Sequence, residues 1–319
     1  MARVIPGIHH VTAIAGDPQA NIDFYASVLG LRLVKLTVNY DDPSTYHLYF
    51  GDEQGHPGTI LTFFPWPGVP KGQKGSGQAV DTSFSIPEKA LDYWTGRLKA
   101  HRVPFEGPFG RFDERVISLS DPDGLSLELV SGASSAKDRL WEMGPVQSEY
   151  AIRGFHHVTL SEKESGLTAT LLTETMGFRS LGREGDKVRF ETGNGGPGAI
   201  VDLLVQPGRP RGLISVGTTH HVAWRTPSDG EQRDWREAIA EAGLNVTPII
   251  DRRYFHSIYY REPGGVLFEI ATELPGFTVD QPVEELGTRL VLPPWLEPSR
   301  TEIESHLPRV NLPKPVPAR

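Results

Sequence analysis

The sequence predicts an α+β protein in which one strand–helix–strand module is repeated four times. The tripeptide His-His-Val occurs at His9–Val11, His156–Val158 and His220–Val222, and these three pairs contain six of the eleven histidines in the 319-residue chain. Eleven histidines placed at random would seldom give even one such pair, so we interpret the pairs as markers of an internal repeat. Gly (34) and Pro (27) are both frequent, which is typical of a strand-rich chain with many tight turns.

Each histidine pair opens a similar passage. An alternating strand comes first, in GIHHVTAIAG, GFHHVTLS and TTHHVAWRT. A helical segment follows, in DPQANIDFYASVLG, KESGLTATLLTETMG and DGEQRDWREAIAEAG. Gly30 and Gly177 each stand 20 residues after the second His of their module. A glycine in a left-handed conformation would end the helix at that point.

A fourth copy lacks the histidines. The passage AVDTSFSIPEKALDYWTGRLKAHRV has the same strand-then-helix pattern, and its closing strand DPDGLSLELV resembles EPGGVLFEIA. Alignment of the strands places Thr82 where the other modules have their second His. The closing strands then carry Thr62, Glu128, Asp202 and Glu269 at matching positions.

These alignments predict four modules followed by a tail. The modules span 5–66, 78–132, 152–206 and 216–273. The connector 133–151 contains AKDRLWEM, for which we expect one or two helical turns. The tail 274–319 is Pro-rich, with a short helix predicted at TEIESHL, and we expect it to lie over the body of the protein.

Composition excludes several classes of function. The net charge is −8 and no block of Lys or Arg is present, which argues against a nucleic-acid or anionic-membrane partner. The absence of cysteine excludes disulfides, cysteine-based zinc sites and thiol nucleophiles. No uncharged apolar run is long enough to span a bilayer, and the N-terminus lacks the apolar core of a signal peptide. We therefore expect a cytoplasmic location.

The repeated positions predict a metal site. Successive strand residues point to opposite faces, so only one His of each pair faces the inside of a curled sheet. Two imidazoles and one carboxylate on one face bind Fe(II) and leave positions open for substrate and O₂.

The residues alone leave three pairings of modules open. Modules three and four together would offer four ligands, as in a glyoxalase-like site: His157, Asp202, His221 and Glu269. Modules one and four would offer an open triad of His10, His221 and Glu269, with the poor ligand Thr62 opposite. Modules two and three would hold Glu128, His157 and Asp202, as a second site or a relic of duplication. A structural role is the competing interpretation for every one of these side chains.

The chain resembles a known family over residues 5–273. Its modules look like the βαβββ unit of the vicinal-oxygen-chelate superfamily, and most closely those of the ring-cleaving dioxygenases of hydroquinones and chlorohydroquinones. The residues that carry the resemblance are GIHHVTAIAGDPQANIDFYASVLGLRLVKLTVNYDDPSTYHLYFGD, TTHHVAWRTPSDGEQRDWR, DRRYFHSIYYREPGGVLFEIAT and the tail motif LPPWLEP. The resemblance implies four βαβββ modules forming two curled-sheet barrels.

The resemblance also implies a site and a reaction. Carried onto this chain, the metal ligands are His10, His221 and Glu269, whereas His157 is not a ligand of the catalytic iron. The residues around the ligands are His9, Thr12, His220, Arg252 and Tyr259. The implied cofactor is Fe(II), with Mn(II) also open because both accept such ligands. The implied partners are a small dihydric phenol and O₂, and homo-oligomerisation is left open. A glyoxalase-like lyase or isomerase, or a non-catalytic binding protein, is the alternative.

Overall fold

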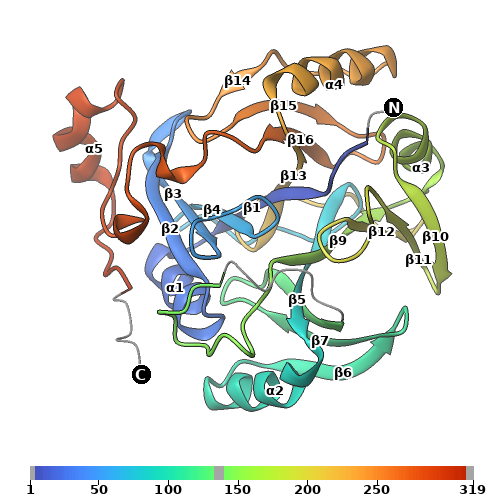
Figure 1. Ribbon diagram of the computed structural model, residues 1–319, viewed down its shortest axis with the longest axis horizontal. Helices are drawn as coiled ribbons and strands as arrows, with labels where there is room; N and C mark the ends of the chain where they lie inside the picture. Colours follow the sequence, from blue (N-terminus) through green and yellow to red (C-terminus); the bar gives the residue numbers. More distant parts are fainter. Residues whose placement is uncertain (1–3, 133–139, 314–319) are drawn as a thin grey trace.

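The computed structural model describes residues 4–132 and 140–313, which form two eight-stranded sheets (Figure 1). The strands of the first sheet are β1 (Ile8–Ala15), β2 (Arg32–Asn39), β3 (Asp42–Gly51), β4 (Ile60–Pro65), β13 (Thr218–Thr226), β14 (Ile250–Asp251), β15 (His256–Arg261) and β16 (Leu267–Thr272). The strands of the second sheet are β5 (Gln78–Pro87), β6 (Phe105–Arg111), β7 (Glu114–Ser120), β8 (Ser126–Gly132), β9 (Phe155–Glu162), β10 (Arg179–Glu184), β11 (Lys187–Glu191) and β12 (Ile200–Val205).

The order of strands shows which parts of the chain share a sheet. The first sheet runs β14-β15-β16-β13-β1-β4-β3-β2, and the second runs β10-β11-β12-β9-β5-β8-β7-β6. Antiparallel pairing of β1 with β13 joins the first and last quarters of the chain, and pairing of β5 with β9 joins the two middle quarters. The predicted α+β architecture with two curled sheets is confirmed.

The described residues contain five α-helices: α1 (Pro18–Ile22), α2 (Leu91–Ala100), α3 (Gly166–Thr170), α4 (Asp229–Glu241) and α5 (Arg300–His306). Helix α4 packs on β13, β15 and β16. Helices α1 and α3 continue as π-helical turns over Asp23–Val28 and Leu171–Thr175. Gly30 and Gly177 follow with φ of 73° and 79°, so the glycine helix ends predicted from the spacing are confirmed. Among the described residues, no helix is long and apolar enough to cross a membrane.

Short 3-10 turns lie beside these elements, at Glu88–Ala90, Phe277–Val279, Val283–Glu285 and Glu297–Ser299. In the connector, residues 140–151 contain turns and no helix. The prediction of helical turns in AKDRLWEM therefore fails over residues 140–143, and its first part lies outside the described residues.

The tail packs along β2 and β3, as predicted, and places α5 beside them (Figure 1). The backbone nitrogen of Val291 donates to the carbonyl oxygen of Leu36 over 2.9 Å. The fully buried ammonium group of Lys35 lies 2.6 Å from the Asp280 carboxylate and donates to the carbonyl oxygen of Phe277. A buried lysine needs such partners, so these bonds fasten the start of the tail to the first sheet.

One part of the sequence alignment is wrong. Ser83 of β5 pairs with Glu128 of β8, just as Thr159 of β9 pairs with Asp202 of β12. The residue that matches His157 is therefore Asp81, two positions before Ser83, and not Thr82. A slip of one residue turns a strand side chain to the opposite face, and Thr82 accordingly takes the place of the apolar residue that follows each His pair.

Candidate metal centre

His10, His221 and Glu269 meet inside the first sheet. The Nε2 atoms of His10 and His221 lie 3.2 Å apart, and Glu269 Oε2 lies 3.3 Å and 3.0 Å from them. All three side chains are buried, and they are the one group among the described residues whose spacing suits a metal ion. The three ligands that the resemblance implied are therefore neighbours in space.

Sheet pairing explains why these three residues meet. His10 lies on β1, His221 on the neighbouring β13, and Glu269 on β16 next to β13. The strand β9, which carries His157, belongs to the other sheet. A four-ligand site that combines His157 with His221 is thus not formed.

Each histidine pair has the same geometry. The Nδ1 atoms of the two adjacent rings lie 2.8 to 2.9 Å apart in all three pairs. In the first pair, His9 Nε2 also lies 3.1 Å from the carbonyl oxygen of Thr272. A carbonyl only accepts, so His9 carries its hydrogen on Nε2 and its Nδ1 accepts from His10 Nδ1. His10 Nε2 is left with a lone pair, which is the form that binds a metal.

Glu269 has one satisfied oxygen and one orphan. The Ser257 hydroxyl donates to Oε1. Oε2 is buried and has no hydrogen bond of acceptable geometry among the described residues, although two imidazole nitrogens lie close to it. A buried carboxylate oxygen without a partner is costly. This oxygen and the neighbouring imidazole nitrogens fit a divalent cation, since two histidines and one carboxylate hold such an ion on one face.

A cavity of about 280 Å³ opens above the three candidate ligands. Its remaining walls come from both halves of the first sheet: Thr12, Asn39, Tyr40, Asp41, His47, Tyr49, Phe64, Trp66, His220, Arg252, Phe255, Tyr259 and Leu267. A cavity of about 150 Å³ is known to hold benzene, so this one has room for a single substituted ring. Both apolar rings and hydrogen-bonding groups line it, as in most small-molecule sites.

Four of the five residues predicted around the ligands line this cavity, namely Thr12, His220, Arg252 and Tyr259. Arg252 Nε donates to the Tyr259 hydroxyl over 3.2 Å, and its Nη1 donates to Asp41 over 2.9 Å. Burial, and then the charge of Glu269, raises the pKa of Tyr259, so this phenol keeps its proton at neutral pH. Burial lowers the pKa of His220 to about 3, so that imidazole is neutral.

His9 lies elsewhere. It does not line the cavity but packs behind His10, where it lines a different hollow with His56 and Phe277. Burial lowers the pKa of His9 to about 3. The structure thus places His9 where it orients His10 and not where it can touch a substrate.

Sequence reasoning missed the wall opposite Arg252 and Tyr259. His47 and Tyr49 project from β3 into the cavity, and Phe255 packs on the rings of His9 and His10 at 5.0 Å. A signal was present in the segment STYHLYF, in which His47 and Tyr49 are two positions apart and so share one face of a strand. Nothing in the chain indicated that this face pointed at the metal ligands.

The second sheet holds a different arrangement at the equivalent place. The guanidinium of Arg111 binds both oxygens of Glu128, and that of Arg189 binds both oxygens of Asp202, at 2.5 to 2.9 Å. His157 Nε2 lies 3.5 Å and 3.4 Å from the two carboxylates. Burial opposes ionisation of Glu128, but Arg111 and His157 lower its pKa to about 2. Arginine thus supplies here the positive charge that a cation would bring.

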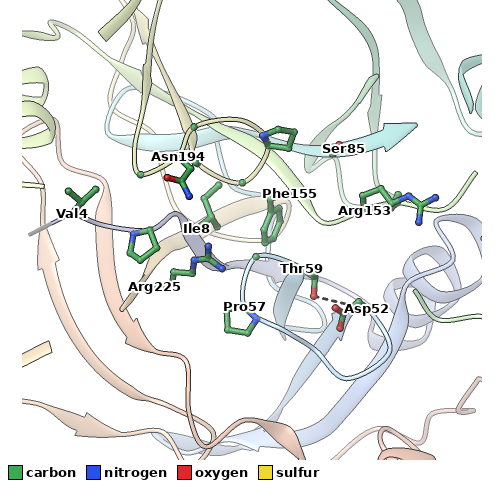
Figure 2. A pocket seen from close by; sticks show the side chains of 18 of the residues that line it. Val4, Ile8, Asp52, Pro57, Thr59, Ser85, Arg153, Phe155, Asn194 and Arg225 are labelled. Carbon is green, nitrogen blue, oxygen red and sulfur yellow. Dashed lines mark hydrogen bonds between the residues drawn. The ribbon is translucent and has the colours of Figure 1, made fainter. Parts of the chain in front are cut away.

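A larger hollow of about 580 Å³ lies where the sheets meet, away from the candidate ligands (Figure 2). Its walls are mainly Gly-Pro loops and apolar residues such as Ile8 and Phe155. Figure 2 shows the guanidinium groups of Arg153 and Arg225 well separated, so they do not converge on one anion. Size alone therefore does not locate the functional site.

Comparison with known proteins agrees with this architecture. The model of the Glyoxalase/Bleomycin resistance protein/Dioxygenase superfamily matches residues 7–129 and 154–270. The chain belongs to this superfamily. MhqO of Bacillus subtilis (strain 168), whose name describes a candidate ring-cleaving dioxygenase, is 48% identical over 96% of this chain and 97% of its own length. The chlorohydroquinone/hydroquinone 1,2-dioxygenase of Sphingobium indicum is 33% identical over 94% and 95% of the two chains.

Solved structures of superfamily members show the same fold. A crystal structure of a candidate dioxygenase from Bacillus subtilis subsp. subtilis superposes with a TM-score of 0.94 at 47% identity, over 98% of this chain and 100% of that one. Glyoxalase I from Zea mays superposes with a TM-score of 0.62 at 15% identity, over 84% and 92% of the two chains. The second likeness concerns the fold alone. The vicinal-oxygen-chelate fold expected from the resemblance is confirmed.

Proposed function

We propose that this protein is a metal-dependent ring-cleaving dioxygenase that inserts both atoms of O₂ into a hydroquinone-type aromatic ring. The observation that carries the proposal is the buried trio of His10, His221 and Glu269, with its orphan carboxylate oxygen at the base of a ring-sized cavity. The names of its relatives MhqO and chlorohydroquinone/hydroquinone 1,2-dioxygenase support the same reaction class.

Fe(II) is the proposed cofactor, with Mn(II) as the alternative that the same ligands accept. When bound, the metal provides coordination positions for a substrate hydroxyl and O₂ and a route for electrons between them. Three protein ligands leave such positions free, and Thr62 opposite them is a poor ligand. To bind the metal, each of the three side chains must have no hydrogen on its ligating atom. The lone pair on His10 Nε2 and the orphan oxygen of Glu269 meet this requirement.

The remaining cavity residues bind and orient the ring. Arg252 and Tyr259 form one polar wall, in which the arginine donates to the phenol oxygen. The Tyr259 hydroxyl also lies within hydrogen-bond reach of Ser257, so the guanidinium of Arg252 is the donor that this wall offers to a substrate oxygen. Donors placed where negative charge collects on the substrate stabilise it in a water-poor site. Phe255 and Trp66 supply apolar surface for the ring.

A pair of matched variants tests the metal site. His10→Ala should lose bound iron and O₂ uptake, because one of the three proposed ligands is gone. His157→Ala should keep the metal content of the wild type, because His157 lies in the arginine-filled second sheet. Metal is measured by elemental analysis after anaerobic reconstitution with Fe(II).

An oxygen electrode tests the reaction. Protein reconstituted with Fe(II) should consume O₂ when hydroquinone or a chlorinated hydroquinone is added, and the product should have lost its aromatic absorbance. If no dihydric phenol in a broad panel causes O₂ uptake by iron-loaded protein, the dioxygenase proposal fails. Loss of metal from His157→Ala instead of His10→Ala would overturn the assignment of ligands.

A further inference from the structure

A second set of side chains in the cavity forms a continuous chain of hydrogen bonds. Tyr49 OH lies 2.8 Å from His47 Nδ1, and His47 Nε2 lies 2.8 Å from Thr62 Oγ1. Thr62 Oγ1 in turn lies 2.9 Å from Thr12 Oγ1. The four residues come from β3, β4 and β1, and none is a candidate metal ligand. Thr12, His47 and Tyr49 line the cavity, while the two threonines are fully buried.

This chain of hydrogen bonds mirrors the wall formed by Arg252 and Tyr259. Tyr49 stands opposite Thr62 in the pairing of β3 with β4, as Tyr259 stands opposite Glu269 in the pairing of β15 with β16. His47 then occupies the position of Ser257, and both bond to the side chain at the same place on the neighbouring strand. The internal repeat thus sets two hydrogen-bonded walls on either side of the candidate ligands.

Donors and acceptors alternate along these hydrogen bonds in a definite direction. Among the described residues, the buried Tyr49 hydroxyl has one hydrogen-bond partner, His47 Nδ1. A phenol is a better hydrogen-bond donor than acceptor, and an unprotonated imidazole nitrogen is a good acceptor. Tyr49 therefore donates to Nδ1. A neutral imidazole with one acceptor nitrogen carries its hydrogen on the other, so His47 Nε2 donates to Thr62.

The direction continues to the cavity. Because Thr62 accepts from His47, its own hydrogen goes to Thr12, and the hydrogen of Thr12 is left for the cavity. Burial lowers the pKa of His47 well below the usual value, which favours its neutral form. Its ring is also clamped between Tyr49 at 4.0 Å and Phe64 at 4.3 Å.

We propose that Tyr49, His47 and Thr62 form a relay that makes Thr12 a hydrogen-bond donor to an anionic oxygen of the aromatic substrate. Thr12 touches the substrate, and His47 and Tyr49 are positioning residues that set the direction of the relay. The inference rests on the proposed function for the identity of the substrate. Hydrogen bonds in series polarise one another, so the relay strengthens the donor at its end. Together with the guanidinium of Arg252, it presents a hydrogen-bond donor from each wall, which suits a phenolate and disfavours a cationic ligand.

The direction of the relay is measurable without metal or substrate. In metal-free protein labelled with ¹⁵N-histidine, long-range ¹H–¹⁵N correlation spectra report which ring nitrogen carries the hydrogen. His47, assigned by loss of its signals in His47→Gln, should carry it on Nε2. In Tyr49→Phe the donor to Nδ1 is gone, and the hydrogen should shift towards Nδ1. A hydrogen on Nδ1 of His47 in the wild-type protein would overturn the proposed direction.

Steady-state kinetics test the effect on substrate. In Fe(II)-reconstituted protein with hydroquinone, Tyr49→Phe should lower kcat/KM roughly fivefold, the effect of about one net hydrogen bond, with the metal content unchanged. Tyr46→Phe is the matched control, because Tyr46 lies on the same strand but bonds to the tail at Pro308. Equal kcat/KM in the two variants would overturn the proposal.

A pair of substitutions at His47 separates a relay from simple packing. Glutamine places an amide donor near the position of Nε2, whereas asparagine places its amide near Nδ1. His47→Gln should therefore retain more kcat/KM than His47→Asn, and both should bind the wild-type amount of iron. If asparagine is the better replacement, the relay does not run through Nε2. A wild-type protein that consumes no O₂ would instead defeat the proposed function, while the spectra still judge the relay.

Discussion

At the scale of single residues, the site depends on neighbours that set the form of each candidate ligand. His9 holds His10 in the tautomer that leaves Nε2 free, because His9 itself donates to the Thr272 carbonyl. Ser257 holds one oxygen of Glu269 and leaves the other directed at the imidazoles. Partners of this kind orient metal ligands and raise metal affinity.

Ser257→Ala should weaken metal binding without abolishing it. Loss of the hydroxyl frees Glu269 to rotate, and removal of such a partner typically costs about 10- to 100-fold in metal affinity. Competition with a metal chelator, followed by elemental analysis, gives the affinity. The exposed Ser305 supplies the control Ser305→Ala, which should match the wild type. Unchanged affinity in Ser257→Ala would show that packing alone orients Glu269.

At the scale of elements, a pair of buried carboxyl groups lies at two strand ends. Glu162 ends β9, and Glu262 begins the turn between β15 and β16. Glu262 accepts from Thr168 and from the backbone nitrogens of Gly264 and Val266. Within the described part of the chain, Glu162 has no such set of donors. Burial, and then the charge of Glu262, raises the pKa of Glu162 to about 8. Glu162 is therefore protonated at neutral pH.

This pair predicts a pH-dependent stability. A glutamate in the unfolded chain has a pKa of about 4.3, so the folded chain binds the proton more tightly. The contribution is fully present below about pH 4 and is lost as the pH rises through about 8. Between pH 6 and 9 the thermal midpoint of the wild type should fall more steeply than that of Glu162→Gln. The exposed Glu237 provides the control Glu237→Gln, which should follow the wild type. Parallel curves for wild type and Glu162→Gln would refute the prediction.

At the scale of the whole molecule, the two sheets share one architecture but carry different side chains at the equivalent place. The first sheet has an open cavity over its imidazoles and carboxylate, whereas the second has two guanidinium–carboxylate pairs at the equivalent place. Arg189 also binds Glu114 over 2.9 Å, which extends the network towards β7. We infer that the second sheet supports the fold while the first carries the site.

Arg189→Met should destabilise the protein and leave metal binding intact. Removal of this guanidinium strands the buried carboxylate of Asp202, and breaking a buried ion pair by loss of one partner costs about 3–5 kcal/mol. Urea unfolding measures the loss. The double variant Arg189→Met with Asp202→Leu removes both charges and should recover much of the stability. A double variant as unstable as the single one would show that the charges do not explain the loss.

Much of this architecture could be predicted from the chain because it depends on local periodicity. The histidine pairs and the glycines 20 residues beyond them mark the repeat, and strand alternation assigns one His of each pair to the inside. The second module lacked these markers, and there the alignment slipped by one residue, from Asp81 to Thr82. One position of error is enough to turn a strand residue to the other face.

The sequence by itself determined the module, its fourfold repetition and the set of residues able to bind a metal. The chain's own periodicity left three pairings of modules open, because strand pairing between distant modules depends on contacts far apart in sequence. The tertiary structure joined β1 to β13 and β5 to β9. That choice brings His10 to His221 and Glu269, leaves His157 to the arginines, and turns His47 and Tyr49 into the wall of a cavity.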